Sequence, residues 1–252
     1  MDIDKANIDN LVRLWGKYGA KKICEWPIVH ANTHWPHRCW FALNTLSPEN
    51  KLPIESNSNT AWLINMPESG IFSVLPMEDV NRQKVIEKLF IKNNYQCCFQ
   101  QTAMYMPLDE VVENDTVSHD GFEMIVVNDI NQINQWVDIG NEAFGYKIDP
   151  TVIEPLINDK DIRLFLGYLN AQPVASALLF KTDEVIGIHQ VGVRHDCQNK
   201  GIGRSLIQSL IPVCTSWQAK HIVLQASEIG QSLYKRLGFK EQFIINYYQK
   251  ES

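Results

Sequence analysis

The sequence lacks the features that mark several large protein classes. Its net charge is −6 and no run of Lys and Arg exceeds two residues, whereas a nucleic-acid binder clusters its positive charge. No stretch approaches the roughly 20 consecutive apolar residues that span a membrane. The first twenty residues include Asp2, Asp4 and Lys5 and contain no apolar core of a secretory signal. We therefore expect a cytoplasmic protein that binds neither nucleic acid nor a membrane.

Metal-binding spacing and two nucleotide motifs are also missing. The six cysteines are scattered without C-x-x-C spacing, which indicates free thiols in a reducing compartment. His30, His34 and His37 lie near Cys39, but their spacing does not fit the common zinc arrangements, so we expect no metal site. Neither G-x-G-x-x-G nor G-x-x-x-x-G-K followed by Ser or Thr occurs, which argues against an ATP- or NAD-binding domain.

The chain does have enough apolar material for well-packed cores. Apolar residues make up 45% of the 252 residues, and seven residues are tryptophan. Domains usually contain about 100–150 residues, so two domains are expected. The acidic and polar segment 109–121 is the best linker candidate. We therefore predict a smaller α/β domain over residues 1–110 and a second domain over residues 118–252.

Hydrophobic periodicity predicts alternating helices and strands in both domains. In the N-terminal domain we expect a helix at 4–18, a loop at 45–60, strands at 61–66 and 70–75, a helix at 80–93 and a strand at 97–107. In the second domain we expect strands at 122–127, 162–168, 174–180, 185–193, 222–226 and 242–248, and helices at 130–144, at 204–217 and around residue 234.

The segment from Gln198 to Gly203 is the most informative part of the chain. It lies between an apolar run and an amphipathic run, which predicts a strand, a glycine-bearing turn and a helix. Backbone N–H groups at a helix start lack intrahelical partners, and with the helix dipole they attract an anion such as a pyrophosphate. The two glycines let a phosphate approach where a Cβ would clash. A tight connection without a ligand is the alternative.

A second motif follows downstream, where residues 233–234 are Leu-Tyr and residues 237–239 are Leu-Gly-Phe. This motif resembles the late signature of the GCN5-related N-acetyltransferases, the GNAT superfamily. Residues 198–203 match that family's cofactor signature, which is Gln or Arg, two residues, Gly, one residue, and Gly or Ala. The resemblance covers about residues 120–250. It implies an α/β (α+β) fold with a mixed, mostly antiparallel sheet flanked by helices.

The N-terminal domain shows a helix followed by a strand, which is also the order that ends the chain. We therefore hypothesise that residues 1–110 are a degenerate GNAT-like half without the glycine turn, since no Gln-x-x-Gly-x-Gly occurs there. A helix followed by a strand is common in α/β proteins. An unrelated α/β domain is therefore the alternative.

The resemblance implies roles for the residues around the glycine turn. The Gln198 side chain would brace the turn, and the strand end Val191-Gly192-Val193 would offer backbone groups to the pantetheine arm of coenzyme A. The Val191 N–H would polarise the thioester carbonyl. Ser227 stands where many relatives have an Asn that contacts the cofactor. The pyrophosphate would bind the backbone of Asn199, Lys200, Gly201, Ile202, Gly203 and Arg204, although solvated surface is an equal alternative for the two basic side chains.

Tyr234 matches the family tyrosine that protonates the leaving thiolate. A tyrosine has an ordinary pKa near ~10, so it is protonated at neutral pH and can donate to a basic thiolate. Leu233 and Leu237 are expected to point to the core, which would leave Tyr234 free of that packing face. A merely packed or cofactor-contacting ring is the alternative.

A general base is also needed, because most amine substrates are protonated at pH 7. His189 is expected on the same strand face as Val191 and Val193 by the period of two, and its ordinary pKa near ~6.5 suits the task. Glu142 is the second candidate, because it lies on the helix that commonly walls the acceptor site in this fold. Some relatives use water chains instead.

Together these motifs predict an acyl-CoA-dependent N-acyltransferase. We expect it to move an acetyl group from acetyl-CoA to an amine of a small molecule or peptide, by direct attack in a ternary complex. A different acyl group and a homodimer are left open. The alternative is a non-catalytic coenzyme A-binding or interaction module that retains the fold.

Overall fold

A computed structural model describes residues 1–25, 27–42, 63, 66–77, 80–109 and 120–251. The predicted loop at 45–60, most of the predicted strand at 61–66 and most of the linker at 109–121 lie outside the described residues. Contacts divide the chain into two compact units. Unit 1 contains Met1–Leu14 and Ala103–Gln242, and unit 2 contains Trp15–Thr102 and Phe243–Ser252.

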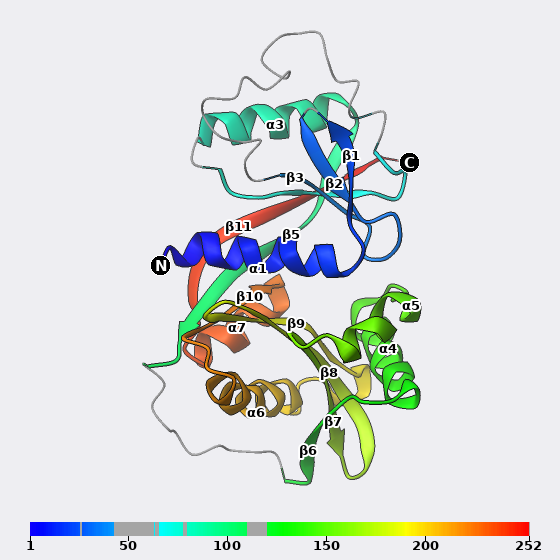
Figure 1. The fold of residues 1–252 in the computed structure, drawn as a ribbon, viewed down its shortest axis with the longest axis vertical. Coiled ribbons are helices and arrows are strands. Elements are labelled where there is room, and N and C mark those ends of the chain that lie inside the picture. Colours follow the sequence, from blue (N-terminus) through cyan, green and yellow to red (C-terminus); the bar gives the residue numbers. More distant parts are fainter. Residues whose placement is uncertain (26, 43–62, 64–65, 78–79, 110–119, 252) are drawn as a thin grey trace. The chain divides into compact units, whose positions relative to one another are not determined.

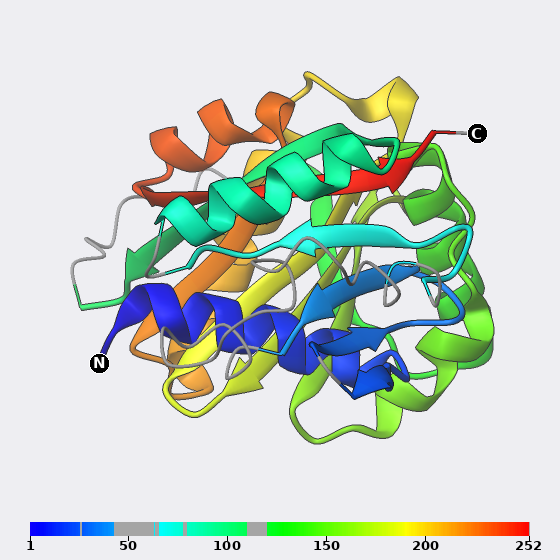
Figure 2. The same cartoon turned by 90° about the horizontal axis from the view of Figure 1, so that it is seen from above.

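Both halves of the chain contain helices and strands (Figures 1 and 2). The first half has α1 (Ile3–Lys17), β1 (Lys21–Glu25), β2 (Ile28–Ala31), β3 (Arg38–Phe41), β4 (Ile71–Val74), α3 (Val80–Lys92) and β5 (Tyr95–Pro107). The second half has β6 (Phe122–Val126), α4 (Ile130–Phe144), α5 (Pro150–Ile153), η2 (Glu154–Asn158), β7 (Ile162–Leu169), β8 (Gln172–Thr182), β9 (Val185–Val193), η3 (His195–Cys197), α6 (Ile202–Ser216), β10 (His221–Ala226), α7 (Glu228–Arg236) and β11 (Lys240–Lys250).

The two units differ from the predicted division, because neither is continuous in sequence. Unit 1 includes the first part of α1 and the end of β5, whereas unit 2 includes most of β11. In unit 2, β11 pairs antiparallel with β4, with Tyr247 opposite Ser73. In unit 1, β5 is the neighbour of β10. Each half of the chain therefore contributes its last strand to the sheet of the other half, which a linker search along the sequence does not detect.

Unit 2 contains a sheet with the strand order β1-β2-β3-β4-β11-β5. The strands β1, β2 and β3, with five, four and four residues, are not predicted from the sequence. The core lies on the α3 side of this sheet, where Phe90 stacks on Tyr248 with ring centroids 5.3 Å apart. The parallel pair β3 and β4, then α3 and β5, repeats the order of β9, β10, α7 and β11. This connectivity agrees with the hypothesis of a GNAT-like half, which remains a hypothesis.

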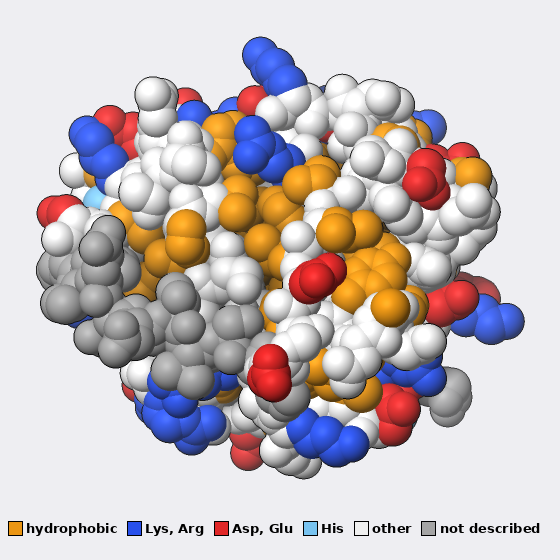
Figure 3. All heavy atoms as spheres, turned by 90° about the horizontal axis from the view of Figure 1, so that it is seen from below, with side chains coloured by type: hydrophobic (Ala, Val, Ile, Leu, Met, Phe, Trp, Pro, Cys, Tyr) orange, Lys and Arg blue, Asp and Glu red, His pale blue; other side chains and the backbone are white. Residues whose placement is uncertain are grey.

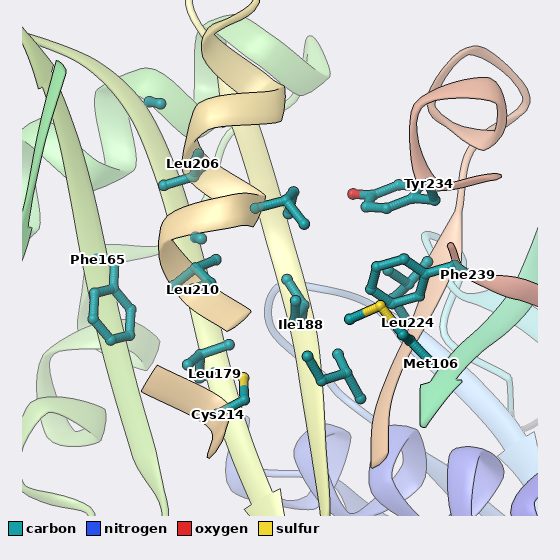
Figure 4. Packing of buried hydrophobic residues seen from close by; sticks show 14 of the residues in the cluster. Met106, Phe165, Leu179, Ile188, Leu206, Leu210, Cys214, Leu224, Tyr234 and Phe239 are labelled. Atoms are coloured by element: carbon teal, nitrogen blue, oxygen red, sulfur yellow. The ribbon is translucent and has the colours of Figure 1, made fainter. Parts of the chain in front are cut away.

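Unit 1 contains the strand order β5-β10-β9-β8-β7-β6. The pairs from β6 to β9 are antiparallel, and β9 with β10 is parallel. The helix α6 packs on one face of this sheet, where Leu206, Leu210 and Cys214 are fully buried (Figure 4). The predicted apolar stripe of this helix is confirmed, and it fixes the helix start against the end of β9.

The helix α4 packs against strands β7, β8 and β9. Asp129 caps its first turn by accepting a hydrogen bond from the Gln132 N–H at 2.9 Å. Gly145 ends it with a left-handed φ of 70°. The Trp136 indole is fully buried and donates to the Ala177 carbonyl at 3.0 Å. The predicted helix at 130–144 is therefore confirmed at both ends.

Side chains of each kind are mixed on the surface that Figure 3 shows. Lys and Arg side chains of the described residues lie apart from one another, with Asp and Glu among them, and hydrophobic side chains gather near the centre.

All six cysteines are free thiols, as predicted. No helix in the described part of the chain is long and apolar enough to cross a membrane. Among the same residues no group of three or more His, Cys, Asp or Glu side chains is placed to hold a metal ion.

Candidate active site

The strands β9 and β10 run side by side only at their first residues. Val185, Ile186 and Gly187 of β9 are paired with residues 221–223 of β10. Among the described residues the pairing ends there, although β9 continues to Val193 and β10 to Ala226. One backbone edge of β9 is therefore left without a strand partner beyond Gly187. An extended ligand can bind to such an edge through main-chain hydrogen bonds.

The other edge of β9 pairs with β8 through a bulge. Gly192 lies opposite Ser176 and His189 lies opposite Leu178, so two residues of β9 face one residue of β8. Gln190, in the bulge, has a left-handed φ of 52°. An inserted residue shifts the alternation of side chains by one position. The period-two argument therefore fails across this point of the strand.

This shift overturns the expected position of His189. Val191 and Val193 pack against the α6 core cluster, whereas the His189 Nε2 lies 2.8 Å from the Asn10 Oδ1 on α1. His189 is only 8% exposed, and burial lowers its pKa to about 3 against the opposing effect of a Gln225 hydrogen bond. The prediction that it shares a face with Val191 and Val193 is wrong. The imidazole is neutral at pH 7 and enclosed by hydrogen-bond partners.

The glycine turn connects the end of β9 to the start of α6. The Gln198 Nε2 donates to the Val193 carbonyl at 3.1 Å, so this side chain braces the turn as expected. Asn199 and Gly201 have left-handed φ values of 59° and 84°. Gly201 is the N-cap of α6, and the first helical bond runs from the Ser205 N–H to its carbonyl at 3.0 Å. The three N–H groups of residues 202–204 therefore lack intrahelical partners.

The two glycines of this turn differ in their surroundings. A Cβ added at Gly201 would meet no atom within 4 Å, so its left-handed backbone is what requires glycine. A Cβ at Gly203 would lie 3.5 Å from Leu233 and 3.7 Å from Val193, which are ordinary contacts. The protein itself therefore leaves room beside the turn for a phosphate.

The side chains of the turn divide into core and surface. Ile202 is 1% exposed, so only its backbone can meet a ligand. Lys200 and Arg204 are exposed, and neither has an ion-pair partner within the described ranges. Their charges add to the positive end of the α6 dipole. The turn therefore combines free N–H donors, a helix start and two uncompensated cations, which together favour a polyanion.

Glu142 connects α4 to the loop that precedes the turn. Its Oε1 accepts a hydrogen bond from the His195 N–H at 2.7 Å, and its Oε2 lies 3.6 Å from the Arg194 Nε. Arg194 also lies 3.5 Å from the Asp196 carboxylate. Sequence reasoning did not single out Arg194, because no motif includes it. The Glu142 carboxylate is thus already engaged in holding η3.

Tyr234 lies in α7 among the core residues on the α6 side. It is 8% exposed, and its ring meets Phe239 edge-on with centroids 5.6 Å apart. Leu233 and Leu237 are only half-buried, and Leu237 packs against the same core cluster that contains Tyr234. The prediction that Tyr234 is free of this packing face is therefore wrong. The Tyr234 hydroxyl points from α7 toward β9 and α6 (Figure 4). Burial raises the pKa of Tyr234 above its ordinary value, so the phenol stays protonated.

The other predicted cofactor contacts lie at the same end of the unit 1 sheet. Ser227 caps α7, since its Oγ accepts from the Gly230 N–H at 3.2 Å, and its hydroxyl proton is left for a further acceptor. The Val193 carbonyl is turned away from β8 toward Gln198. Gly192 is buried against α4, where an added Cβ would lie 3.1 Å from Ala143. The role of the Val191 N–H at a thioester stays a prediction.

Comparison with known proteins agrees with this geometry. Residues 131–239 match the model of the Acetyltransferase (GNAT) family. These residues form a GNAT acetyltransferase domain. Members of this family are generally acyl-CoA-dependent acetyltransferases. A search of curated proteins finds no significant match.

Solved structures share the fold over most of the chain. A GCN5-related N-acetyltransferase from Kribbella flavida aligns with a TM-score of 0.63 at 15% identity, covering 99% of this chain and 95% of that chain. One from Sphaerobacter thermophilus has a TM-score of 0.63 at 13% identity, covering 88% and 75%. A functionally unknown protein from Staphylococcus epidermidis has a TM-score of 0.59 at 20% identity, covering 92% and 94%. These likenesses concern the fold.

Proposed function

We propose that the GNAT domain transfers an acetyl group from acetyl-CoA to an amine of a small molecule or peptide. The observation that carries the proposal is the end of β9–β10 pairing at Gly187 together with the open glycine turn at the start of α6. The unpaired edge of β9 suits the amides of a pantetheine arm. The N–H groups of residues 202–204 suit the pyrophosphate at its end.

The chemistry we propose is direct attack within a ternary complex. The free amine forms a bond to the thioester carbonyl carbon, and the carbonyl oxygen gains negative charge that the Val191 N–H would stabilise. Collapse of the tetrahedral intermediate breaks the carbon–sulfur bond. The Tyr234 hydroxyl, which burial keeps protonated, would give its proton to the departing thiolate. The proton that the amine loses to water would restore the phenol, so the products are the amide and free coenzyme A.

We assign removal of the amine proton to water rather than to His189 or Glu142. The His189 imidazole is 8% exposed, and burial lowers its pKa to about 3. The Glu142 carboxylate accepts from the His195 N–H and faces Arg194. Both side chains therefore have structural partners that proton transfer would disturb.

The same observation favours a second candidate function. A domain that keeps the glycine turn but has no side chain free to act as base can bind coenzyme A without turnover. In this case the chain would be an interaction module that retains the GNAT fold. The two functions differ in one measurable quantity, the release of free thiol in the presence of an amine.

The first test is the melting temperature with saturating acetyl-CoA, with ATP and NAD as controls. A ligand at about 100 times its dissociation constant stabilises the native state by about 2.7 kcal/mol, which raises the melting temperature by several degrees. A rise specific to acetyl-CoA, followed by thiol release with members of an amine panel, supports the enzyme. The same rise without thiol release supports the binding module. No rise in folded protein contradicts both.

A further inference from the structure

A cluster of buried polar side chains lies between α1 and the sheet of unit 1. Asn10 is fully buried, and its Nδ2 donates to the Phe180 carbonyl at 2.9 Å and to the Thr182 hydroxyl at 2.8 Å. With the amide oriented in this way, the Asn10 Oδ1 accepts from the His189 Nε2–H at 2.8 Å. Asn10 therefore ties α1 to both β8 and β9.

Asn7 connects α1 to the strands β10, β5 and β11. It is 1% exposed, and its Oδ1 accepts from the Gln225 Nε2 of β10 at 2.6 Å. Its Nδ2 donates to the Met104 carbonyl of β5 at 3.2 Å and to the Gln242 Oε1 of β11 at 2.6 Å. A hydrogen bond between the Gln225 and His189 side chains joins the two groups. We call Asn7, Asn10, His189 and Gln225 the amide cluster.

The amide cluster lies at the point where β9 and β10 separate. The last recorded pair of these strands is Gly187 with Val223. His189 and Gln225 each lie two residues further along their own strand, and therefore on the same face as that pair. A Cβ at Gly187 would lie 2.0 Å from the Asn10 Oδ1 and 2.2 Å from the His189 Nε2. The cluster thus fills the space that a side chain at residue 187 would need.

We propose that the amide cluster holds β9 and β10 apart and so sets the width of the opening between them. Hydrogen bonds of the cluster join α1 to β8 and β9 through Asn10 and to β10 through Asn7. A change in the spacing of β9 and β10 would therefore break at least one buried hydrogen bond. The helix α1 lies outside residues 131–239, which match the family model. The helix α1 thereby positions the opening between β9 and β10, into which the cofactor would bind. This last step rests on the proposed function.

The experiment compares Asn10→Ala with a matched control in the protein without ligand. The control is Asn32→Ala, because Asn32 is also 1% exposed and its Nδ2 donates to backbone carbonyls, those of Trp15 and Tyr18, in unit 2. Hydrogen exchange is followed in peptides that contain β9 and β10, with β7 as the internal reference. Asn10→Ala removes three buried hydrogen bonds, and loss of one already corresponds to about tenfold, so we expect it to accelerate exchange in β9 and β10 at least about tenfold relative to β7. Asn32→Ala should leave this ratio unchanged.

A second variant covers the case in which Asn10→Ala does not fold. Gln225 is only partly buried, so Gln225→Ala removes its hydrogen bonds to Asn7 and His189 with a smaller loss of packing. It should accelerate the same two strands selectively. Uniform acceleration of β7, β9 and β10, or no acceleration in either variant, would overturn the proposed role of the cluster.

Acetyl-CoA affinity then separates this role from the proposed function. If the wild type binds acetyl-CoA, we expect Gln225→Ala and Asn10→Ala to raise its dissociation constant about tenfold, which corresponds to one buried hydrogen bond. Faster exchange with an unchanged dissociation constant would show that the cluster holds the strands. It would refute the proposal that the cluster positions the opening for the cofactor. If the wild type does not bind acetyl-CoA, the proposed function fails, and the exchange data still decide whether the cluster holds the strands.

Discussion

Two substitutions at Glu142 can tell a proton acceptor from a structural brace. Glu142→Gln keeps an oxygen that can accept the His195 N–H, which now lies 2.7 Å from Oε1, but it removes the negative charge. Glu142→Ala removes the acceptor entirely. The side chains of Glu142 and Arg194 are 34% and 41% exposed, so water can reach both groups after either change. We expect Glu142 to act as a brace for η3 and the glycine turn.

The expected magnitudes follow from these contacts. A hydrogen bond to a charged acceptor contributes about 1.5–3 kcal/mol and one between neutral groups about 0.5–1.5 kcal/mol, so Glu142→Gln should lose about 1 kcal/mol. The exposed ion pair with Arg194 adds at most about 1 kcal/mol. If the brace orders the turn, the dissociation constant of acetyl-CoA should rise less than about tenfold in Glu142→Gln and about 10- to 150-fold in Glu142→Ala. The value of kcat should change little in both.

A general base gives the opposite pattern. Loss of a positioned base lowers kcat by about 10²–10⁴, and Gln cannot replace it. The assay is therefore kcat from thiol release and the acetyl-CoA dissociation constant from calorimetry, for both variants and the wild type. A fall in kcat of about a hundredfold or more in Glu142→Gln, with unchanged acetyl-CoA affinity, would refute the brace and restore Glu142 as the base.

Three further predictions concern the turn, the tyrosine and the histidine. Gly203→Glu should abolish acetyl-CoA binding, as measured by calorimetry. Gly203→Ala should retain binding, because its Cβ would meet only ordinary contacts at 3.5 and 3.7 Å. Equal binding by both variants would show that the turn is not part of the site. Tyr234→Phe should lower kcat at least about tenfold at unchanged melting temperature, while Tyr168→Phe, which loses a 2.7 Å bond to Gln135, serves as control; full activity would make the ring structural. Burial lowers the His189 pKa from 6.5 to about 3, so below pH 6.5 the unfolded chain binds the extra proton, and stability falls as the pH drops from 6.5 toward 3. Urea unfolding should show about 1 kcal/mol less loss per pH unit between pH 6.5 and 5 in His189→Gln than in the wild type, and equal slopes would contradict a neutral buried imidazole.

The sequence predicts the elements of the second half well because local signals determine them. The helix at 130–144 has an N-cap Asp and a C-cap Gly at its two ends, and the structure begins and ends it at the predicted residues. The strand at 185–193 is apolar or glycine except at His189 and Gln190, and it is also found with the predicted bounds. The glycine turn depends on Asn199 and Gly201, whose left-handed backbone conformation is a local requirement. In each case the physical cause lies within a few residues of the effect.

The face of His189 could not be predicted, because its cause lies in strand pairing. The bulge at Gln190 leaves no signal in the alternation of β9, since apart from His189 and Gln190 the residues of this strand are apolar or glycine on both faces. The register with β8, in which Ser176 and Leu178 are opposite Gly192 and His189, is what reveals it. The burial of Tyr234 was missed for a related reason. In this helix of nine residues, Leu233, Tyr234 and Leu237 lie close together along the chain. The helical period alone therefore does not decide which of these side chains is buried.

The division of the chain into units has a consequence for the active site. The family match at residues 131–239 includes the turn, β9, β10 and Tyr234, but it leaves out Asn7, Asn10 and Met104. Those residues come from the first part of α1 and the end of β5, which belong to unit 1 although they precede the match by up to 124 positions, from residue 7 to residue 131. The buried partners of His189 and Gln225 are therefore supplied by a distant part of the sequence. Because an unpaired buried amide or imidazole is costly, the first fourteen residues are an integral part of unit 1.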